Sequence, residues 1–224
     1  MVCVEIGLIG AGRVGSNLAH RWTEAGHDVL ISFSRDPDKL AGVARDVGAT
    51  AGSVADAAAF GDVVVVSVPW GTLDEVAGEA GSLWGKILVD TTNQFGPNGV
   101  IALPTTAAET NRSRFPGVAY AKAFNTLTAK FQTDAADRPK DARSAMFYVA
   151  EQEASSTVEQ LIEAVGFVPV SLGGPEDAEL LEAPRRDGSV YGEAYRPDDA
   201  RRIAAEYYAG GDAASLAVEL KQPG

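Results

Sequence analysis

Three glycines near the amino terminus have the spacing of a turn that binds dinucleotide phosphates. Residues 10–15 read Gly-Ala-Gly-Arg-Val-Gly and lie between an apolar run at residues 4–9 and a segment with helical spacing. In such a unit Gly10 permits the tight turn, and Gly12 lets the backbone approach the pyrophosphate. Gly15 lets the helix pack closely on the strand. We therefore predict that this segment binds a dinucleotide.

The two residues between the second and third glycines lie at the start of the predicted helix. The N-terminus of a helix offers free N–H groups and a partial positive charge to an anion. We therefore include Arg13 and Val14 among the cofactor-binding residues. The side chain of Arg13 can approach the phosphates or face solvent, and the sequence leaves both open.

The end of the second predicted strand, residues 29–33, indicates which dinucleotide is bound. An NAD site has a carboxylate there, which accepts a hydrogen bond from the ribose 2′-hydroxyl. Here Ser34 and Arg35 follow the strand, and both can donate to a 2′-phosphate. Asp36 is the competing carboxylate, but the Pro37 that follows it favours a helix cap. We predict NADP(H) in preference to NAD(H), with a solvent-exposed Arg35 as the alternative.

The elements around these residues alternate between strand and helix patterns. Residues 63–68 are apolar without alternation, which is typical of a strand buried on both faces of a parallel sheet. Further strands are expected at 86–89, 118–123, 145–150 and 167–170, and helices at 14–25, 37–47, 73–80 and 155–165. The predicted fold class is α/β, a Rossmann-type doubly wound, mostly parallel sheet with a short helical C-terminal extension.

Composition divides the chain near residue 172. We predict an NADP-binding Rossmann domain over residues 1–172 and a small helical extension over residues 173–224. Within the extension only Pro197–Tyr208 keeps a helical stripe, which is too short to form a core of its own. We expect this helix to pack on the Rossmann domain or across the two-fold axis of a homodimer, beside the nicotinamide pocket.

Charge and composition exclude several other classes of function. The net charge of −12 argues against nucleic-acid binding, and no apolar run approaches the ~18 residues that cross a bilayer. One cysteine, Cys3, and two histidines are too few for the usual metal sites. The amino terminus lacks a secretory signal, so we expect a cytoplasmic protein. We also expect its partner to be a small molecule.

Several of these segments together resemble a known family. Residues 122–126, which read Lys-Ala-Phe-Asn-Thr, form the most specific motif. With residues 10–15, Ser34-Arg35 and the strand end Val68-Pro69, they resemble the NADPH:F-420 oxidoreductases, in which F-420 is a 5-deazaflavin hydride carrier. A similar N-terminal module occurs in STEAP-type metalloreductases. The resemblance covers about residues 4–183.

The resemblance implies where the nicotinamide lies and what reaction takes place there. It implies that this end of the site is lined by Val68, Pro69, Trp70, Asn93, Ala123, Asn125 and Thr126. Of these, Trp70, Asn125 and Thr126 are the candidate catalytic residues. Hydride transfer between two planar carriers needs stacked rings about 3–3.5 Å apart and no covalent catalyst. Asn125 and Thr126 can hydrogen-bond either ring, or can stabilise the turn at the strand end.

Two departures from the family leave the hydride acceptor open. Asn93 is followed by Gln94, where the family commonly has proline, and the tail from Ala183 onward does not match the family. Reduction of F-420 is therefore one hypothesis. Reduction of another acceptor, such as a flavin, a quinone or a ferric chelate, is a second. A non-catalytic NADP-binding redox sensor is the third.

Binding of a deazaflavin of the F-420 type also requires positive charge at the site. It carries a phosphate and a glutamate tail, so the rim of its cleft needs cationic side chains. The candidates from the sequence are Lys122, Lys130, Arg185 and Arg186, and the alternative for each is a surface charge in solvent.

Overall fold

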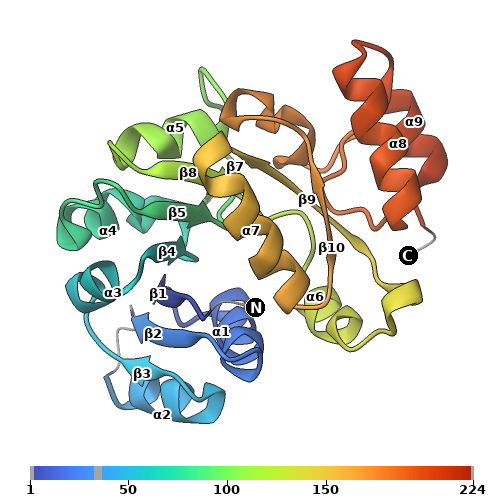
Figure 1. The fold of residues 1–224 in the computed structure, drawn as a ribbon. Coiled ribbons are helices and arrows are strands. Elements are labelled where there is room, and N and C mark those ends of the chain that lie inside the picture. Colours follow the sequence, from blue (N-terminus) through green and yellow to red (C-terminus); the bar gives the residue numbers. More distant parts are fainter. Residues whose placement is uncertain (1–2, 33–36, 223–224) are drawn as a thin grey trace.

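A single eight-stranded sheet runs through the computed structural model, with helices on both faces (Figure 1). The structure describes residues 3–32 and 37–222. The strand order is β10-β9-β8-β5-β4-β1-β2-β3. All neighbouring strands are parallel except β8 and β9, so that β9 and β10 run against the rest. The predicted fold class, a doubly wound and mostly parallel sheet, is confirmed.

The strands of this sheet have the following bounds: β1 (Glu5–Ile9), β2 (Asp28–Ser32), β3 (Thr50–Ala51), β4 (Val63–Val66), β5 (Ile87–Asp90), β8 (Ala119–Lys122), β9 (Ala145–Ala150) and β10 (Val168–Ser171). A separate hairpin consists of β6 (Phe95–Gly96) and β7 (Gly99–Val100). This hairpin lies within residues 95–104, a stretch rich in glycine, proline and asparagine. The direction of β9 and β10 is likewise a finding of the structure.

Alternate residues of β4 enter two separate hydrophobic clusters, one on each face of the sheet. Its four valines are all buried, which explains the uninterrupted apolar run. One face is covered by α1 (Arg13–Glu24), α2 (Pro37–Val47), α6 (Ala129–Ala136) and α7 (Gln152–Ala164). The other is covered by α3 (Val54–Phe60), α4 (Leu73–Ala80), α5 (Ala107–Arg114), α8 (Pro197–Tyr208) and α9 (Ala213–Leu220). Short 3-10 helices occur at η1 (Trp70–Thr72), η2 (Lys140–Ala142) and η3 (Pro175–Leu181).

The chain changes direction across the sheet between β1 and β4. From β1 it continues to β2 and β3 on one side, and then crosses to β4 and β5 on the other. In open α/β sheets such a switch leaves a crevice outside the carboxyl ends of the two strands, and ligands bind there. Gly10 follows β1 and Ser67 follows β4, so these two residues mark the crevice.

The C-terminal extension shares the core of the Rossmann sheet. Ala200, Ile203 and Ala204 of α8 are buried in the same cluster as Val64 of β4, together with residues of α9. The two helices lie at the β9–β10 end of the molecule, opposite β3 and α2 (Figure 1). The helix predicted at Pro197–Tyr208 therefore packs on the Rossmann domain. The boundary at residue 172 stays a prediction, because one core contains residues from both sides of it.

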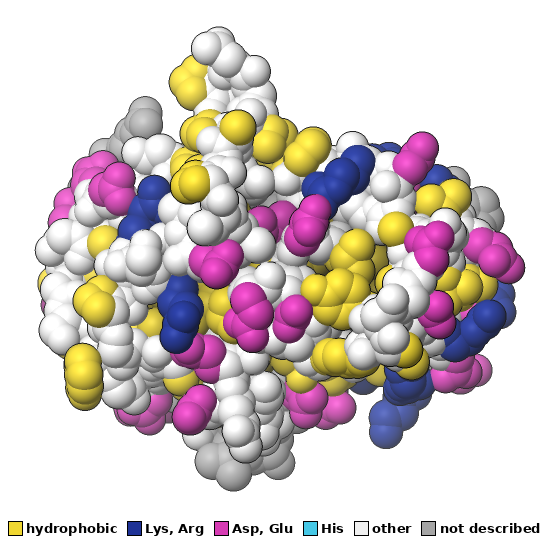
Figure 2. Space-filling view, turned by 90° about the horizontal axis from the view of Figure 1, so that it is seen from above, with side chains coloured by type: hydrophobic (Ala, Val, Ile, Leu, Met, Phe, Trp, Pro, Cys, Tyr) yellow, Lys and Arg dark blue, Asp and Glu magenta, His cyan; other side chains and the backbone are white. Residues whose placement is uncertain are grey.

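Acidic side chains are spread over the face drawn in Figure 2, which agrees with the net charge of −12. Within residues 3–32 and 37–222, no helix combines the length and the apolar character needed to cross a bilayer.

Candidate functional site

The three glycines of the β1–α1 turn each meet a different steric requirement. Gly10 has φ +131°, and a Cβ atom on it would overlap the carbonyl oxygen of Ser67 across the crevice. A Cβ on Gly15 would overlap the carbonyl oxygen of Gly10, so this glycine allows α1 to pack on the turn. A Cβ on Gly12, by contrast, would meet nothing within 4 Å. Gly12 is therefore not needed by the folded chain itself, which is the arrangement expected where a ligand approaches the backbone.

Gly12 is the N-cap of α1, with extended backbone at φ −81° and ψ −175°. It has no side chain to accept hydrogen bonds from the first turn of the helix. The first N–H groups of an α-helix have no partner within the helix, and an anion can accept from them. The turn thus fits a dinucleotide pyrophosphate in both space and hydrogen-bonding capacity.

A cavity of about 520 Å³ lies in front of this turn. Gly12, Arg13 and Val14 form one wall, and Ser67, Val68, Pro69 and Trp70 from the end of β4 and η1 form another. The remaining walls come from the ends of β5 and β8, with Thr91, Thr92, Asn93, Phe95, Thr128, Ala129 and Lys130. The structure thus brings the glycine turn together with Val68, Pro69, Trp70 and Asn93. Among the residues lining this cavity there is none from α8, which packs elsewhere on the sheet.

Asn93 and Asn125 form a reciprocal pair across the ends of β5 and β8. The Asn93 Nδ2 donates to the Asn125 carbonyl oxygen at 3.0 Å, and the Asn125 Nδ2 donates to Asn93 Oδ1 at 3.1 Å. Asn125 Nδ2 also donates to the Leu181 carbonyl oxygen at 2.7 Å. Asn125 is buried and does not line the cavity, whereas Asn93 does. Within this pair Asn125 holds the amide of Asn93 in place at the cavity wall.

The backbone that presents Asn125 is in a conformation that side chains rarely adopt. Phe124 has φ +62°, in the left-handed region that is unfavourable for a bulky residue. Its ring packs edge-on against Trp22 at a centroid distance of 5.8 Å, and Gln132 Nε2 donates to its carbonyl oxygen at 3.0 Å. These contacts stabilise the strained residue. The turn at Phe124 thereby ends β8 and directs Asn125 toward Asn93.

Two further residues of this segment are also buried. Ala123 is fully enclosed, and the Thr126 hydroxyl faces the sulfur of Met146 at 3.9 Å. The Thr126 carbonyl oxygen accepts from the N–H of Gly192 at 2.8 Å, which links the segment to the extension. Ala123 and Thr126 lie behind the cavity wall and are not among its lining residues. Ser34 and Arg35, the predicted 2′-phosphate ligands, lie outside the described residues.

A buried ion pair lies beneath the Asn93–Asn125 wall. Lys122 Nζ is 3.0 Å from Asp90 Oδ2 and donates to the Thr92 carbonyl oxygen at 2.6 Å. Asp90 also accepts from the Tyr120 hydroxyl at 2.6 Å and from Asn111 Nδ2 at 2.7 Å. The expectation that Lys122 lies at the cleft rim is therefore wrong. Its side chain points from β8 into the core because Asp90 of the neighbouring strand β5 offers it a charge partner there.

The surroundings of Asp90 decide its protonation. Burial alone would raise the pKa of this carboxyl, but the Lys122 ammonium and the hydrogen bonds from Tyr120, Asn111 and the Thr92 N–H lower the pKa below its usual value. Asp90 is therefore ionised in the folded protein at neutral pH.

Glu182 is a second buried carboxylate nearby. Its two oxygens accept from the N–H groups of Ala107 and Ala108, both at 2.7 Å, at the start of α5. Burial raises the pKa of Glu182 in spite of these bonds and of Lys122. Glu182 thereby holds the end of η3 against α5, and sequence reasoning gave it no role.

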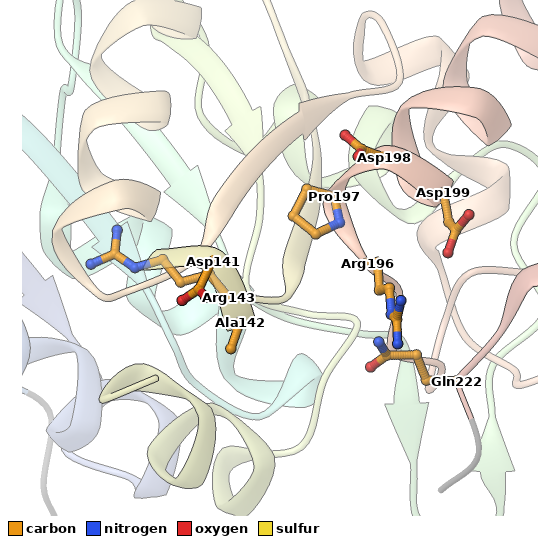
Figure 3. Close-up of a pocket in the computed structure, with 8 residues that line it drawn as sticks. All are labelled: Asp141, Ala142, Arg143, Arg196, Pro197, Asp198, Asp199 and Gln222. Atoms are coloured by element: carbon orange, nitrogen blue, oxygen red, sulfur yellow. The ribbon is translucent and has the colours of Figure 1, made fainter. Parts of the chain in front are cut away.

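A different cavity, of about 750 Å³, lies between η2 and the start of α8 (Figure 3). Asp141, Ala142 and Arg143 form one side, and Arg196 to Asp199 with Gln222 form the other. The guanidinium of Arg143 points away from Arg196 (Figure 3). No residue of the glycine turn or of the 122–126 segment lines this cavity, so we do not assign the cofactor to it.

The buried ion pair leads to a prediction about how the stability of a Lys122 variant depends on pH. Lys122→Met leaves Asp90 charged and buried without its cation, so we expect a loss of about 3–5 kcal/mol in the free energy of unfolding at pH 7. In the variant, burial raises the folded-state pKa of Asp90 above its unfolded value of about 3.9. The variant then gains stability from Asp90 as pH falls toward that value, while in the wild type the lowered pKa of Asp90 keeps its contribution constant between pH 7 and pH 5. Urea unfolding at pH 7 and pH 5 measures the difference in free energy of unfolding between the wild type and the variant. An equal difference at the two pH values would contradict the assignment of Lys122 as the charge partner of Asp90.

The chain is similar to known proteins over much of its length. Residues 5–94 match the family model described as NADP oxidoreductase coenzyme F420-dependent. The chain is 28% identical to the F420-dependent NADP reductase of Methanothermobacter thermautotrophicus, over 81% of this chain and 86% of that protein. It is 29% identical to the metalloreductase STEAP3 of Rattus norvegicus over 80% of this chain, but spans only 36% of the length of that relative.

A solved structure has the same fold. A hypothetical protein, SMa0349, from Sinorhizobium meliloti superposes with a TM-score of 0.73 and 29% identity, covering 83% of this chain and 92% of that one. These comparisons confirm the resemblance expected from the glycine turn and the 122–126 motif: the chain is similar to NADP oxidoreductases described as coenzyme F420-dependent.

Proposed function

We propose that this protein is an NADP-dependent oxidoreductase that transfers a hydride between NADP(H) and a deazaflavin of the F-420 type. The observation that carries the proposal is the cavity bounded by Gly12, by Val68-Pro69-Trp70 and by Asn93. It lies at the switch point of the sheet, with a phosphate-binding turn at one end and an amide held at the other.

The residues present fit a dinucleotide. The open space at Gly12 and the first turn of α1 receive the pyrophosphate, and Arg13 adds a positive charge at the cavity wall. Val68, Pro69 and Trp70 provide an apolar surface for the nicotinamide, and Asn93 provides hydrogen-bonding groups for its carboxamide. Ser34 and Arg35 bind the 2′-phosphate that distinguishes NADP from NAD.

The proposed reaction balances without a covalent catalyst. NADPH supplies a hydride, two electrons and one proton, from C4 of its nicotinamide. The hydride forms a C–H bond at C5 of the deazaflavin, a ring nitrogen takes a proton from water, and NADP⁺ remains. The chain has to align the two rings and exclude water from between them.

The acceptor is the least constrained part of the proposal. The coenzyme F-420 assignment follows from the 122–126 motif and from the relatives named above. The runner-up is NADPH-dependent reduction of another acceptor, such as a flavin, a quinone or a ferric chelate. The likeness to a metalloreductase favours that alternative.

The reaction is tested with purified protein, NADPH and each acceptor in turn. We expect the visible absorbance of the deazaflavin to fall when NADPH is added, at a rate proportional to the enzyme concentration. Reduction of flavin or ferric chelate but not of the deazaflavin would replace the proposal with its runner-up. Tight NADPH binding with turnover of none of these acceptors would favour a non-catalytic sensor.

The glycine turn allows a matched pair of variants. Gly12→Val adds its side chain where the folded chain leaves open space, so we expect a folded protein with no detectable NADPH binding. Gly15→Val forces a side chain against the Gly10 carbonyl, so we expect it to lose stability by about 1–3 kcal/mol or more. Circular dichroism, thermal unfolding and NADPH fluorescence titration separate the two. Normal NADPH binding by folded Gly12→Val would show that the turn holds no pyrophosphate.

Cofactor choice is tested at Arg35. A hydrogen bond to a charged group contributes roughly 1.5–3 kcal/mol, so Arg35→Ala should weaken NADPH binding by about 10- to 100-fold and leave NADH binding nearly unchanged. Arg45→Ala, on the exposed last turn of α2, is the matched control for the loss of one charge. Equal affinities of the wild type for NADPH and NADH would refute the assignment.

A further inference from the structure

A cavity of about 700 Å³ lies between the α6 region and part of the extension, next to the cofactor cavity. We call it the extension cleft. Leu127, Thr128, Phe131 and Arg138 line it from the α6 side. Arg185, Gly192, Glu193, Ala194, Val218, Lys221 and Gln222 line it from the extension. Thr128, the N-cap of α6, lines both this cleft and the cofactor cavity, so the two cavities are neighbours at this residue.

The charge of the cleft is opposite to that of the protein. Its lining has three cationic side chains, Arg138, Arg185 and Lys221, and one carboxylate, Glu193. The chain as a whole has a net charge of −12. A local excess of positive charge on an acidic protein concentrates an anionic ligand at that place.

The carboxylate is less exposed than the two cations that it contacts. Glu193 is only 13% exposed, whereas the side chain of Arg185 is 64% exposed and that of Lys221 is 40% exposed. Arg185 Nε donates to Glu193 Oε1 at 3.0 Å, and Lys221 Nζ is 3.7 Å from the same oxygen. One partly buried carboxylate thus contacts both cations, and all three side chains line the cleft.

The third cation is held without a carboxylate. Arg138 Nη1 donates to Ser144 Oγ at 2.9 Å, and its guanidinium lies 5.2 Å from the centre of the Phe131 ring. Within the part of the chain that the structure describes, no acidic side chain lies within ion-pair distance of Arg138. A planar guanidinium with free N–H groups is suited to a phosphate or carboxylate.

Resting on the function proposed above, we infer that the extension cleft binds the anionic part of the hydride acceptor. The ring of the acceptor occupies the cofactor cavity, and its phosphate- or carboxylate-bearing side chain passes Thr128 to reach Arg138, Arg185 and Lys221. The class of acceptor is therefore a planar redox ring with an anionic side chain. These three cations, and not Lys122, provide the positive charge that the acceptor needs, because Lys122 is buried against Asp90.

The test uses acceptors that differ only in the anionic part. One pair is flavin mononucleotide and riboflavin, and the other is coenzyme F-420 and its ring system without the phosphate and glutamate tail. The variants are Arg138→Gln, Arg185→Gln and Lys221→Gln. The matched control is Arg201→Gln, an exposed arginine on α8 outside the cleft. Circular dichroism checks folding, and if Arg138→Gln does not fold, the other two variants decide.

We expect each cleft variant to raise KM for the anionic acceptor by about 10-fold, the lower end for a charge-assisted hydrogen bond in contact with water. The value of kcat, the KM for NADPH and the KM for the tail-less acceptor should stay unchanged. A fluorescence titration of the acceptor in the presence of NADP⁺ should show the same loss in affinity. Raising the salt concentration should weaken binding of the anionic acceptor more than binding of its tail-less counterpart.

The outcomes separate the inference from the function on which it rests. Equal KM values for the two members of a pair, with cleft variants like Arg201→Gln, would overturn the inference and leave the oxidoreductase intact. A wild type that binds NADPH but reduces no member of either pair would overturn both.

Discussion

The buried ion pair between Lys122 and Asp90 holds the centre of this molecule together. Two charges removed from water are costly, and they are tolerated only where every remaining hydrogen-bonding group is satisfied. Here Tyr120, Asn111 and the backbone of Thr92 complete that requirement. The pair thereby fixes β5, β8 and α5 relative to one another. The Asn93–Asn125 wall lies directly above it, so its geometry depends on this buried contact.

The opposite wall depends on backbone contacts that only glycine allows. At Gly10 and Gly15 the neighbouring carbonyl oxygens occupy the space of a side chain, which brings β1, α1 and the end of β4 close together. Gly12 has no such neighbour, so contacts within the chain do not explain why a glycine is present there. The cavity therefore has one wall set by close backbone approach and one set by buried polar contacts. Neither wall can move without a large cost in stability, which suits a site that must align two rings.

The glycine turn, the buried strand at β4 and the helix at Pro197–Tyr208 were predictable because each rests on local sequence. Lys122 was misplaced because its partner is 32 residues away, on a strand that only the sheet order brings beside it. The helix α5 is mostly polar and has no apolar stripe, so periodicity did not reveal it. Its capping box, Thr106 with Glu109, was a usable signal.

The cations of the extension cleft show a further limit of sequence. Arg138, Arg185 and Lys221 are far apart in the chain and meet only because the extension folds back onto α6, with the Gly192 N–H bonded to the Thr126 carbonyl oxygen. The extension is also where this chain departs from the family that its motifs resemble. On the proposed function, the Rossmann sheet determines the cofactor, and the departing tail determines which acceptor reaches it. A change of acceptor would then need changes mainly in the extension cleft, because the cofactor cavity is lined by residues that follow β1, β4 and β5 and by the start of α6.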